Sequence, residues 1–188
     1  MGGRSKALLR LDDRDCFVTR IVRTFNEAAI SQVVVIVGHE AQAVRATVEV
    51  SGLTARTVLN RDYERGQLSS LVTAINAVDQ PEVDGLLLAL VDAPLFSAST
   101  VRALAERFAQ TGAPVVRAVR GDEHGHPALI GRALFDQMRN ADPAVGAKSI
   151  VRGHASARGD VEVDDPGAFL DIDTPDDYAR VIDSLRGV

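Results

Sequence analysis

Cysteine, excess positive charge and long apolar runs are all scarce in this sequence of 188 residues. The single cysteine, Cys16, cannot form a disulfide within the chain, and no apolar stretch approaches the roughly 20 residues that span a bilayer. The first residues, MGGRSKALLR, lack the unbroken apolar segment of a secretory signal. We therefore expect a cytoplasmic protein with no membrane partner.

The charge balance argues against a nucleic-acid partner. The 21 Lys and Arg residues are outnumbered by 26 Asp and Glu, which gives a net charge of -5 and no basic face. What the sequence does have is the composition of a globular protein with a sizeable core, 46% hydrophobic and 25% charged. No repeat, low-complexity tract or linker divides it, so we expect one domain over residues 1–188.

Strand-like and helix-like segments alternate through the first part of the chain. This pattern predicts an α/β fold of three layers, with a mainly parallel sheet and helices on both of its faces. GLLLALV, at 85–91, is continuously apolar and is expected to be the most buried strand. The expected strands are 32–37, 55–60 and 85–91, and the helices that follow them are 40–48, 67–78 and one capped by Ser97 or Ser99.

The second part of the chain has an α+β texture. A strand is expected at 114–119, after which the alternation loosens in GDEHGHPALIG. Short helices are expected near 133–139 and 146–154, and a strand is expected in DVEVDD. A last helix begins with Thr174 as its cap and Pro175 at its first position.

Asp92 ends the most apolar strand pattern without a polar transition. In open α/β sheets, ligands bind beyond the carboxyl ends of the strands, so a residue in this place points to a site. A carboxylate against apolar packing is costly unless it is paired, hydrogen-bonded or bound to a metal. A turn or cap before Pro94 would explain Asp92 alone equally well.

A second acidic group changes that balance. Asp171 and Asp173 end another short apolar run, and in an extended segment both would project to one face, with Ile172 on the other. Thr174 already starts the following helix, so neither acid is needed as its cap. Two strand-end carboxylates that meet in one crevice would hold Mg²⁺, which takes oxygen ligands beside substrate phosphates.

The other residues with reactive side chains favour ordinary structural roles. Cys16 falls at the start of an amphipathic helix and is expected to be core. His39 follows a strand and is expected to be a solvated loop residue. His124 and His126, beside two acids, suggest zinc, but the usual further ligands are missing.

Four motifs in order carry a resemblance to a known family. They are MGGRSKALL at the start, VDAP at 91–94, GHP at 125–127 and DIDTPDDY at 171–178, with NRDYERGQLSSL at 60–71 between the first two. The chain resembles the MobA-like nucleotidyltransferases over nearly its whole length, and most closely the molybdenum cofactor cytidylyltransferases. The resemblance implies Mg²⁺-dependent transfer of a nucleoside monophosphate, CMP from CTP, to the phosphate of molybdopterin cofactor, with release of pyrophosphate. A molybdoenzyme or its chaperone would be a further partner.

The resemblance also implies a catalytic pair and a phosphate loop. Lys6 is similar to the family lysine that meets the phosphates, and Gly2 and Gly3 match the tail of the Gly-rich loop before it. Asp92 is similar to the aspartate that binds Mg²⁺. Such a reaction brings negative charges together, so metal and lysine suffice and no protein nucleophile is needed.

The remaining roles concern the metal, the base and the acceptor. Asp173 lies where the wider superfamily has a second metal ligand, and Asp171 is the competing choice. The segment Gly66 to Ser70 matches the stretch that contacts the base, so Gly66, Ser69 and above all Ser70 are binding candidates. His126 would face the acceptor.

Three other functions stay open at this point. A guanylyltransferase or a sugar-phosphate nucleotidyltransferase of the same fold would carry the same metal and lysine, and the SSL segment does not distinguish cytosine from guanine. A non-catalytic module that holds a nucleotide or the cofactor is the third. The presence of both Asp92 and Asp173 favours the enzyme.

The start of the sequence departs from the family pattern. Members of the family usually open with an apolar strand and a loop similar to LAAGxSxRMG, whereas this sequence begins inside that loop. Loss of a central strand would leave a gap or an unpaired edge beside the strands at 32–37 and 85–91. We expect Met1 to be a mis-chosen start. The alternative is a genuinely short form that binds nucleotide poorly, and the 188-residue chain is expected to have weak activity or none.

Overall fold

The computed structural model describes residues 5–186, so Gly2 and Gly3 lie outside the described part of the chain. Helices and strands alternate as far as β3, as the sequence pattern predicts. The helices are α1 (Phe17–Glu27), α2 (Ala41–Val50), α3 (Gln67–Val78), α4 (Ala98–Thr111), α5 (Phe135–Arg139), α6 (Lys148–His154) and α7 (Pro175–Arg186). The strands are β1 (Val34–Val37), β2 (Arg56–Leu59), β3 (Gly85–Leu88), β4 (Val115–Arg120), β5 (Glu123–Gly131) and β6 (Asp160–Glu162).

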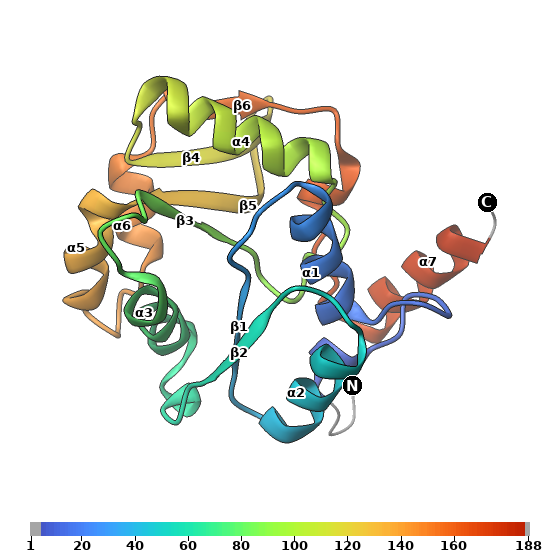
Figure 1. Ribbon diagram of the computed structural model, residues 1–188. Coiled ribbons are helices and arrows are strands. Elements are labelled where there is room, and N and C mark those ends of the chain that lie inside the picture. The colour runs from blue at the N-terminus through green and yellow to red at the C-terminus, as the bar shows by residue number, and fades with distance from the viewer. Residues whose placement is uncertain (1–4, 187–188) are drawn as a thin grey trace.

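The strands form two separate sheets. β1 and β2 pair in parallel in a two-stranded sheet, and the other four strands are ordered β3-β5-β4-β6. In the larger sheet, β5 runs antiparallel to both β3 and β4, whereas β4 and β6 are parallel. Figure 1 shows the two sheets one above the other, with β1 and β3 on their facing sides. The α/β prediction is confirmed, and the pairing is more mixed than a mainly parallel sheet.

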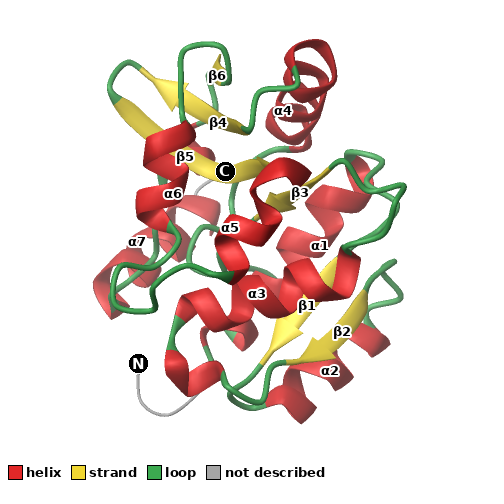
Figure 2. Ribbon diagram, turned by 90° about the vertical axis from the view of Figure 1, so that its left-hand side faces the viewer, coloured by secondary structure: helices red, strands yellow, loops and turns green. Residues whose placement is uncertain are grey.

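Helices cover both faces of the larger sheet, which confirms the three layers. Val115 and Val116 are neighbours on β4 and therefore point to opposite faces. Val116 packs in a cluster with residues of α1 and α4, whereas Val115 packs with residues of α3 and α5. Figure 2 shows these helices around the strands.

The division between the sheets leaves the facing edges of β1 and β3 open. Within residues 5–186, β1 pairs only with β2, and β3 pairs only with β5. Every residue of β3 is half-buried, so the prediction that this strand is the most buried was wrong. An apolar strand with one unpaired edge cannot be covered as fully as one with neighbours on both sides.

The orientation of the β1 backbone follows from its pairing with β2. The carbonyls of Val33 and Val37 accept hydrogen bonds from the backbone N–H groups of Arg56 and Asn60, at 3.0 and 2.8 Å. In a parallel ladder, alternate residues face alternate edges. The N–H of Ile36 therefore points away from β2, toward the open edge.

The N-terminal segment and α7 lie side by side (Figure 1). The hydroxyl of Tyr178 donates to the carbonyl of Arg10 at 2.6 Å, and Phe17 packs with Ile172 and Val181. Cys16 is the N-cap of α1 and is 3% exposed, so its predicted core role is confirmed. None of the helices within residues 5–186 combines the length and apolarity that crossing a membrane requires.

Candidate active site

Asp92 lies in a turn beyond the carboxyl end of β3, where the sequence predicted a ligand-binding residue. Its backbone carbonyl accepts a hydrogen bond of 2.8 Å from the N–H of Ile172, which brings the second acidic segment alongside. The Oδ1 atom of Asp92 is buried and has no hydrogen-bond partner among the described residues. A buried, unpartnered carboxylate oxygen calls for a cation or another polar ligand.

The two acids around Ile172 share a face, as predicted. Ile172 is fully buried in the cluster with Phe17 and Val181, whereas Asp171 and Asp173 are exposed. Because side chains alternate along an extended segment, burial of Ile172 turns both carboxylates to the other side. The local sequence therefore places two carboxylates beside the turn that holds Asp92.

Lys6 reaches the same acidic segment from the opposite end of the chain. Its Nζ atom lies 2.8 Å from Oδ1 of Asp173, and the two side chains are 28% and 64% exposed. Lys6 sits in a short 3₁₀ turn that is anchored where Ala7 and Leu8 pack against the apolar cluster that contains Cys16 and Val37. An ion pair this exposed contributes little to stability, and the lysine remains accessible to a ligand.

His126 lies on β5 near two of the acids. Burial lowers the pKa of His126, and the carboxylates of Asp171 and Asp92 oppose part of that shift. The imidazole is therefore neutral at pH 7, and its buried Nδ1 atom has no partner in the described part of the chain. A Cβ on Gly125 would lie 2.5 Å from the carbonyl oxygen of Ala168, so only glycine fits before this histidine.

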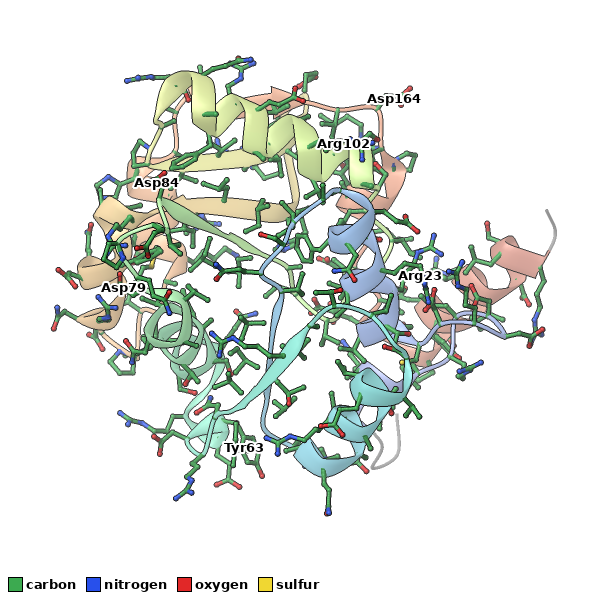
Figure 3. The ribbon with its side chains drawn as sticks, in the orientation of Figure 1. Arg23, Tyr63, Asp79, Asp84, Arg102 and Asp164 are labelled. Carbon is green, nitrogen blue, oxygen red and sulfur yellow. The ribbon has the colours of Figure 1, made fainter. Side chains whose placement is uncertain are left out.

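The predicted base-binding segment comprises the N-cap and first turn of α3, after the connection from β2, where Tyr63 is labelled in Figure 3. Gly66 has a φ of 93°, which favours glycine, and it is the N-cap of α3. The hydroxyl of Ser69 donates to the backbone carbonyls of Asp62 and Gly66, at 2.9 and 2.8 Å. The hydroxyl of Ser69 therefore ties the start of α3 to the preceding connection. The hydroxyl of Ser70 donates to no carbonyl among the described residues and only accepts from Asn60.

Asn60 is a site residue to which the sequence analysis gave no role. It follows β2 directly, is only 3% exposed and donates its side-chain amide to Ser69 and Ser70. A usable signal was present: an uncharged polar residue stands between an apolar strand and a charged loop. His39, expected to be a solvated loop residue, is exposed, with its ring centre 6.4 Å from that of Tyr63.

The structure thus brings together some of the predicted residues and not others. Asp92, Asp171 and His126 interact electrostatically, and Lys6 meets Asp173. Ser70 lies in the first turn of α3, which follows β2 of the other sheet. Nowhere in residues 5–186 do three or more His, Cys, Asp or Glu side chains form a metal-binding group, so a cation here would have one or two carboxylates and otherwise water or substrate oxygens.

Comparison with known proteins decides the family. The model of the MobA-like NTP transferase domain matches residues 1–159. The chain belongs to this family. The expected nucleotidyltransferase family and fold are therefore confirmed. Among curated proteins, none matches the sequence.

Solved structures agree with that assignment. The chain is similar to the Rv0371c homologue from Mycobacterium sp. strain JC1, at 28% identity and a TM-score of 0.76, over 98% of this chain and 90% of that one. It is similar to Rv0371c of Mycobacterium tuberculosis in complex with manganese, at 27% identity and a TM-score of 0.70, over 96% and 93% of the two chains. Molybdopterin-guanine dinucleotide biosynthesis protein A from Archaeoglobus fulgidus has the same fold, at 17% identity and a TM-score of 0.68, over 99% and 93%.

Proposed function

We propose that this MobA-like domain transfers CMP from CTP to the phosphate of molybdopterin cofactor and releases pyrophosphate. The observation that carries the proposal is the buried, unpartnered Oδ1 of Asp92. It lies beside the segment with Asp171 and Asp173, and Lys6 pairs with Asp173. An unpaired buried carboxylate oxygen does not stabilise the fold, whereas a phosphate-transferring site uses such an oxygen as a ligand for its cation.

A divalent cation fits this set of side chains. Carboxylate oxygens are hard ligands, and we propose that Asp92 and Asp173 hold Mg²⁺, with Asp171 as the alternative to Asp173. A cation bound there would neutralise charge on the reacting phosphates. Because a similar structure was obtained as a manganese complex, Mn²⁺ is the second cation to test.

The chain's own residues supply the remaining parts of the site. Among the described residues Lys6 pairs with one exposed carboxylate, so it can exchange that partner for a phosphate of the nucleotide. The neutral imidazole of His126 would hydrogen-bond the acceptor through its unpartnered Nδ1. Gly66 and Ser70 would contact the base from the edge of the other sheet. Together these groups position two anionic reactants, which is the main requirement of phosphoryl chemistry.

The wider assignments follow from the resemblance and remain proposals. We place the reaction in the cytoplasm, within one domain over residues 1–188, with CTP and molybdopterin cofactor as substrates. A molybdoenzyme or its chaperone would receive the product. No nucleic acid or membrane is part of the proposal.

The test is a pyrophosphate-release assay with each of the four NTPs, with Mg²⁺ or Mn²⁺, and with molybdopterin cofactor or a sugar phosphate as acceptor. We expect release only with CTP, cation and molybdopterin cofactor together. Release with GTP, or with a sugar phosphate, would replace the proposed substrate by one of the alternatives. Tight NTP binding with no release under any condition would leave a binding module and would overturn the enzyme.

The second metal ligand is tested by a pair of variants. We expect D173A to lose transfer and D171A to retain most of it, because the proposal assigns the cation to Asp92 and Asp173. Binding of Mn²⁺, followed by paramagnetic broadening, gives a readout besides activity. If D171A is the variant that loses both Mn²⁺ binding and transfer, the choice between these two acids is wrong.

A further inference from the structure

The side-chain amide of Asn60 has a fixed orientation. Its Oδ1 atom accepts a hydrogen bond of 2.9 Å from the backbone N–H of Asp62, which can only donate. The Nδ2 atom must therefore face the other way. Its two hydrogens are directed to Ser69 Oγ and Ser70 Oγ, at 2.9 and 3.1 Å. Both ends of this buried amide are satisfied, one by the connection after β2 and the other by the first turn of α3.

The two serines that receive these hydrogens differ in what they can still do. Ser69 has carbonyl oxygens at hydrogen-bonding distance for its own proton, so its hydroxyl is used within the loop. For Ser70, Asn60 is the one hydrogen-bond partner of the hydroxyl within residues 5–186, and toward Asn60 the oxygen is an acceptor. The proton of Ser70 is therefore uncommitted.

We infer that Asn60 is a positioning residue that orients the hydroxyl of Ser70 to donate its proton toward the nucleotide. The inference rests on the proposed function, in which this loop contacts the base. With one lone pair occupied by the Asn60 N–H, the hydroxyl of Ser70 keeps its proton and one lone pair, so it favours a partner that accepts. The atom of the base that meets Ser70 is then a carbonyl oxygen or an unprotonated ring nitrogen, in preference to an amino group.

The direction of the Ser70 hydrogen bond is tested by replacing Asn60, which donates to Ser70, with a residue that can only accept. In N60D the side chain is a carboxylate of nearly the same shape that can only accept, so Ser70 would donate to it and turn a lone pair toward the base. S70A merely removes one neutral hydrogen bond and is expected to weaken NTP binding about 3- to 10-fold. N60D sets the oxygen of Ser70 against an acceptor atom of the base. It is expected to weaken NTP binding further, by about 10-fold or more.

The double variant separates direction from loop structure. Removal of the Ser70 hydroxyl also removes its unfavourable contact with the base acceptor. N60D/S70A is therefore expected to bind the NTP more tightly than N60D alone. If Asn60 only holds the loop, the double variant would bind no better than N60D. The measurement is calorimetric titration with the NTP that the unmodified chain binds most tightly of the four, with thermal unfolding in parallel.

Two further variants keep the test decisive if N60D folds poorly. N60A frees the hydroxyl of Ser70 to rotate, so its effect on binding should be no larger than that of S70A, and N60A/S70A should match S70A. S69A is the matched control, because it removes the neighbouring hydroxyl that serves the loop: it should lower the unfolding temperature more than it alters the choice of NTP.

The outcomes that overturn the inference are distinct from those that overturn the function. Additive losses in both double variants, while the unmodified chain binds an NTP, would show that Asn60 does not direct Ser70. If the unmodified chain binds none of the four NTPs, the proposed function itself fails, and the role of Ser70 fails with it.

Discussion

Asp92→Ala is the perturbation that best separates chemistry from folding. An unpartnered buried polar group costs about 1–3 kcal/mol, so its removal should offset the small loss of packing at a half-buried position. One kcal/mol moves the unfolding temperature by roughly 2–4 °C in a chain of this size. We therefore expect D92A to unfold at the original temperature or up to about 5 °C above it.

The same variant should lose transfer and metal response together. Loss of about 2.7 kcal/mol of transition-state stabilisation corresponds to 100-fold in rate, and we expect at least that loss. A cation at tenfold its dissociation constant contributes about 1.4 kcal/mol, so Mn²⁺ should raise the unfolding temperature of the original chain by roughly 3–6 °C and leave D92A unchanged.

The matched control is D84A, because Asp84 is exposed and precedes β3 at its opposite end (Figure 3). It should retain both activity and the response to Mn²⁺. The assay is thermal unfolding with and without the cation, alongside pyrophosphate release. If D92A unfolds well below the original temperature yet still turns over and still responds to Mn²⁺, Asp92 is a structural residue and the reasoning is refuted.

Three further predictions concern the scaffold. Hydrogen bonds from Thr174 hold the pKa of Asp177 at about 2, below the usual 3.8, so this cap of α7 is intact above pH 3.8 and is lost as the pH falls toward 2; NMR titration of the Thr174 amide with a midpoint at or above 3.8 would contradict it. Arg23→Met leaves Asp15, 1% exposed, without its partner at 2.8 Å and should lower the free energy of unfolding by about 3 kcal/mol in urea titration, whereas a loss below about 1 kcal/mol would mean water replaces the arginine. The amide of Ile36 should exchange with deuterium at least about 10-fold faster than its two neighbours in β1, and equal rates would mean that the open edge is covered.

The sequence predicted the helices and caps that are determined by interactions between residues close together along the chain. The bounds of α3 are those expected from its apolar spacing, Ser97 caps α4 with its hydroxyl, and Thr174 caps α7. In each case neighbouring residues along the chain decide the outcome. Burial of Ile172 between two exposed acids was predictable for the same reason, since alternation fixes it once the segment is extended.

The elements that the sequence did not predict depend on distant partners. β5 contains Gly125 and Pro127 and begins with the polar residues Glu123 and His124, so its own pattern does not indicate a strand of nine residues. Pairing with β3 on one side and β4 on the other stabilises it. The role of Asn60 was hidden likewise, because a sequence shows a polar residue but not which hydrogens it donates. The Asp171–His126 interaction depends on packing that no motif records.

The open edges of β1 and β3 also bear on how a ligand would be held. Asn60 directly follows β2 of the smaller sheet and holds Ser70 at the start of α3, whereas Asp92 and His126 belong to the larger sheet. Helix packing joins these halves in place of a continuous backbone ladder. Packed helices slide past one another by small shear movements that a hydrogen-bonded ladder resists. A nucleotide with its base on one half and its phosphates on the other would act as a clamp across this shear plane, so the width of the site would be set by the ligand as much as by the protein.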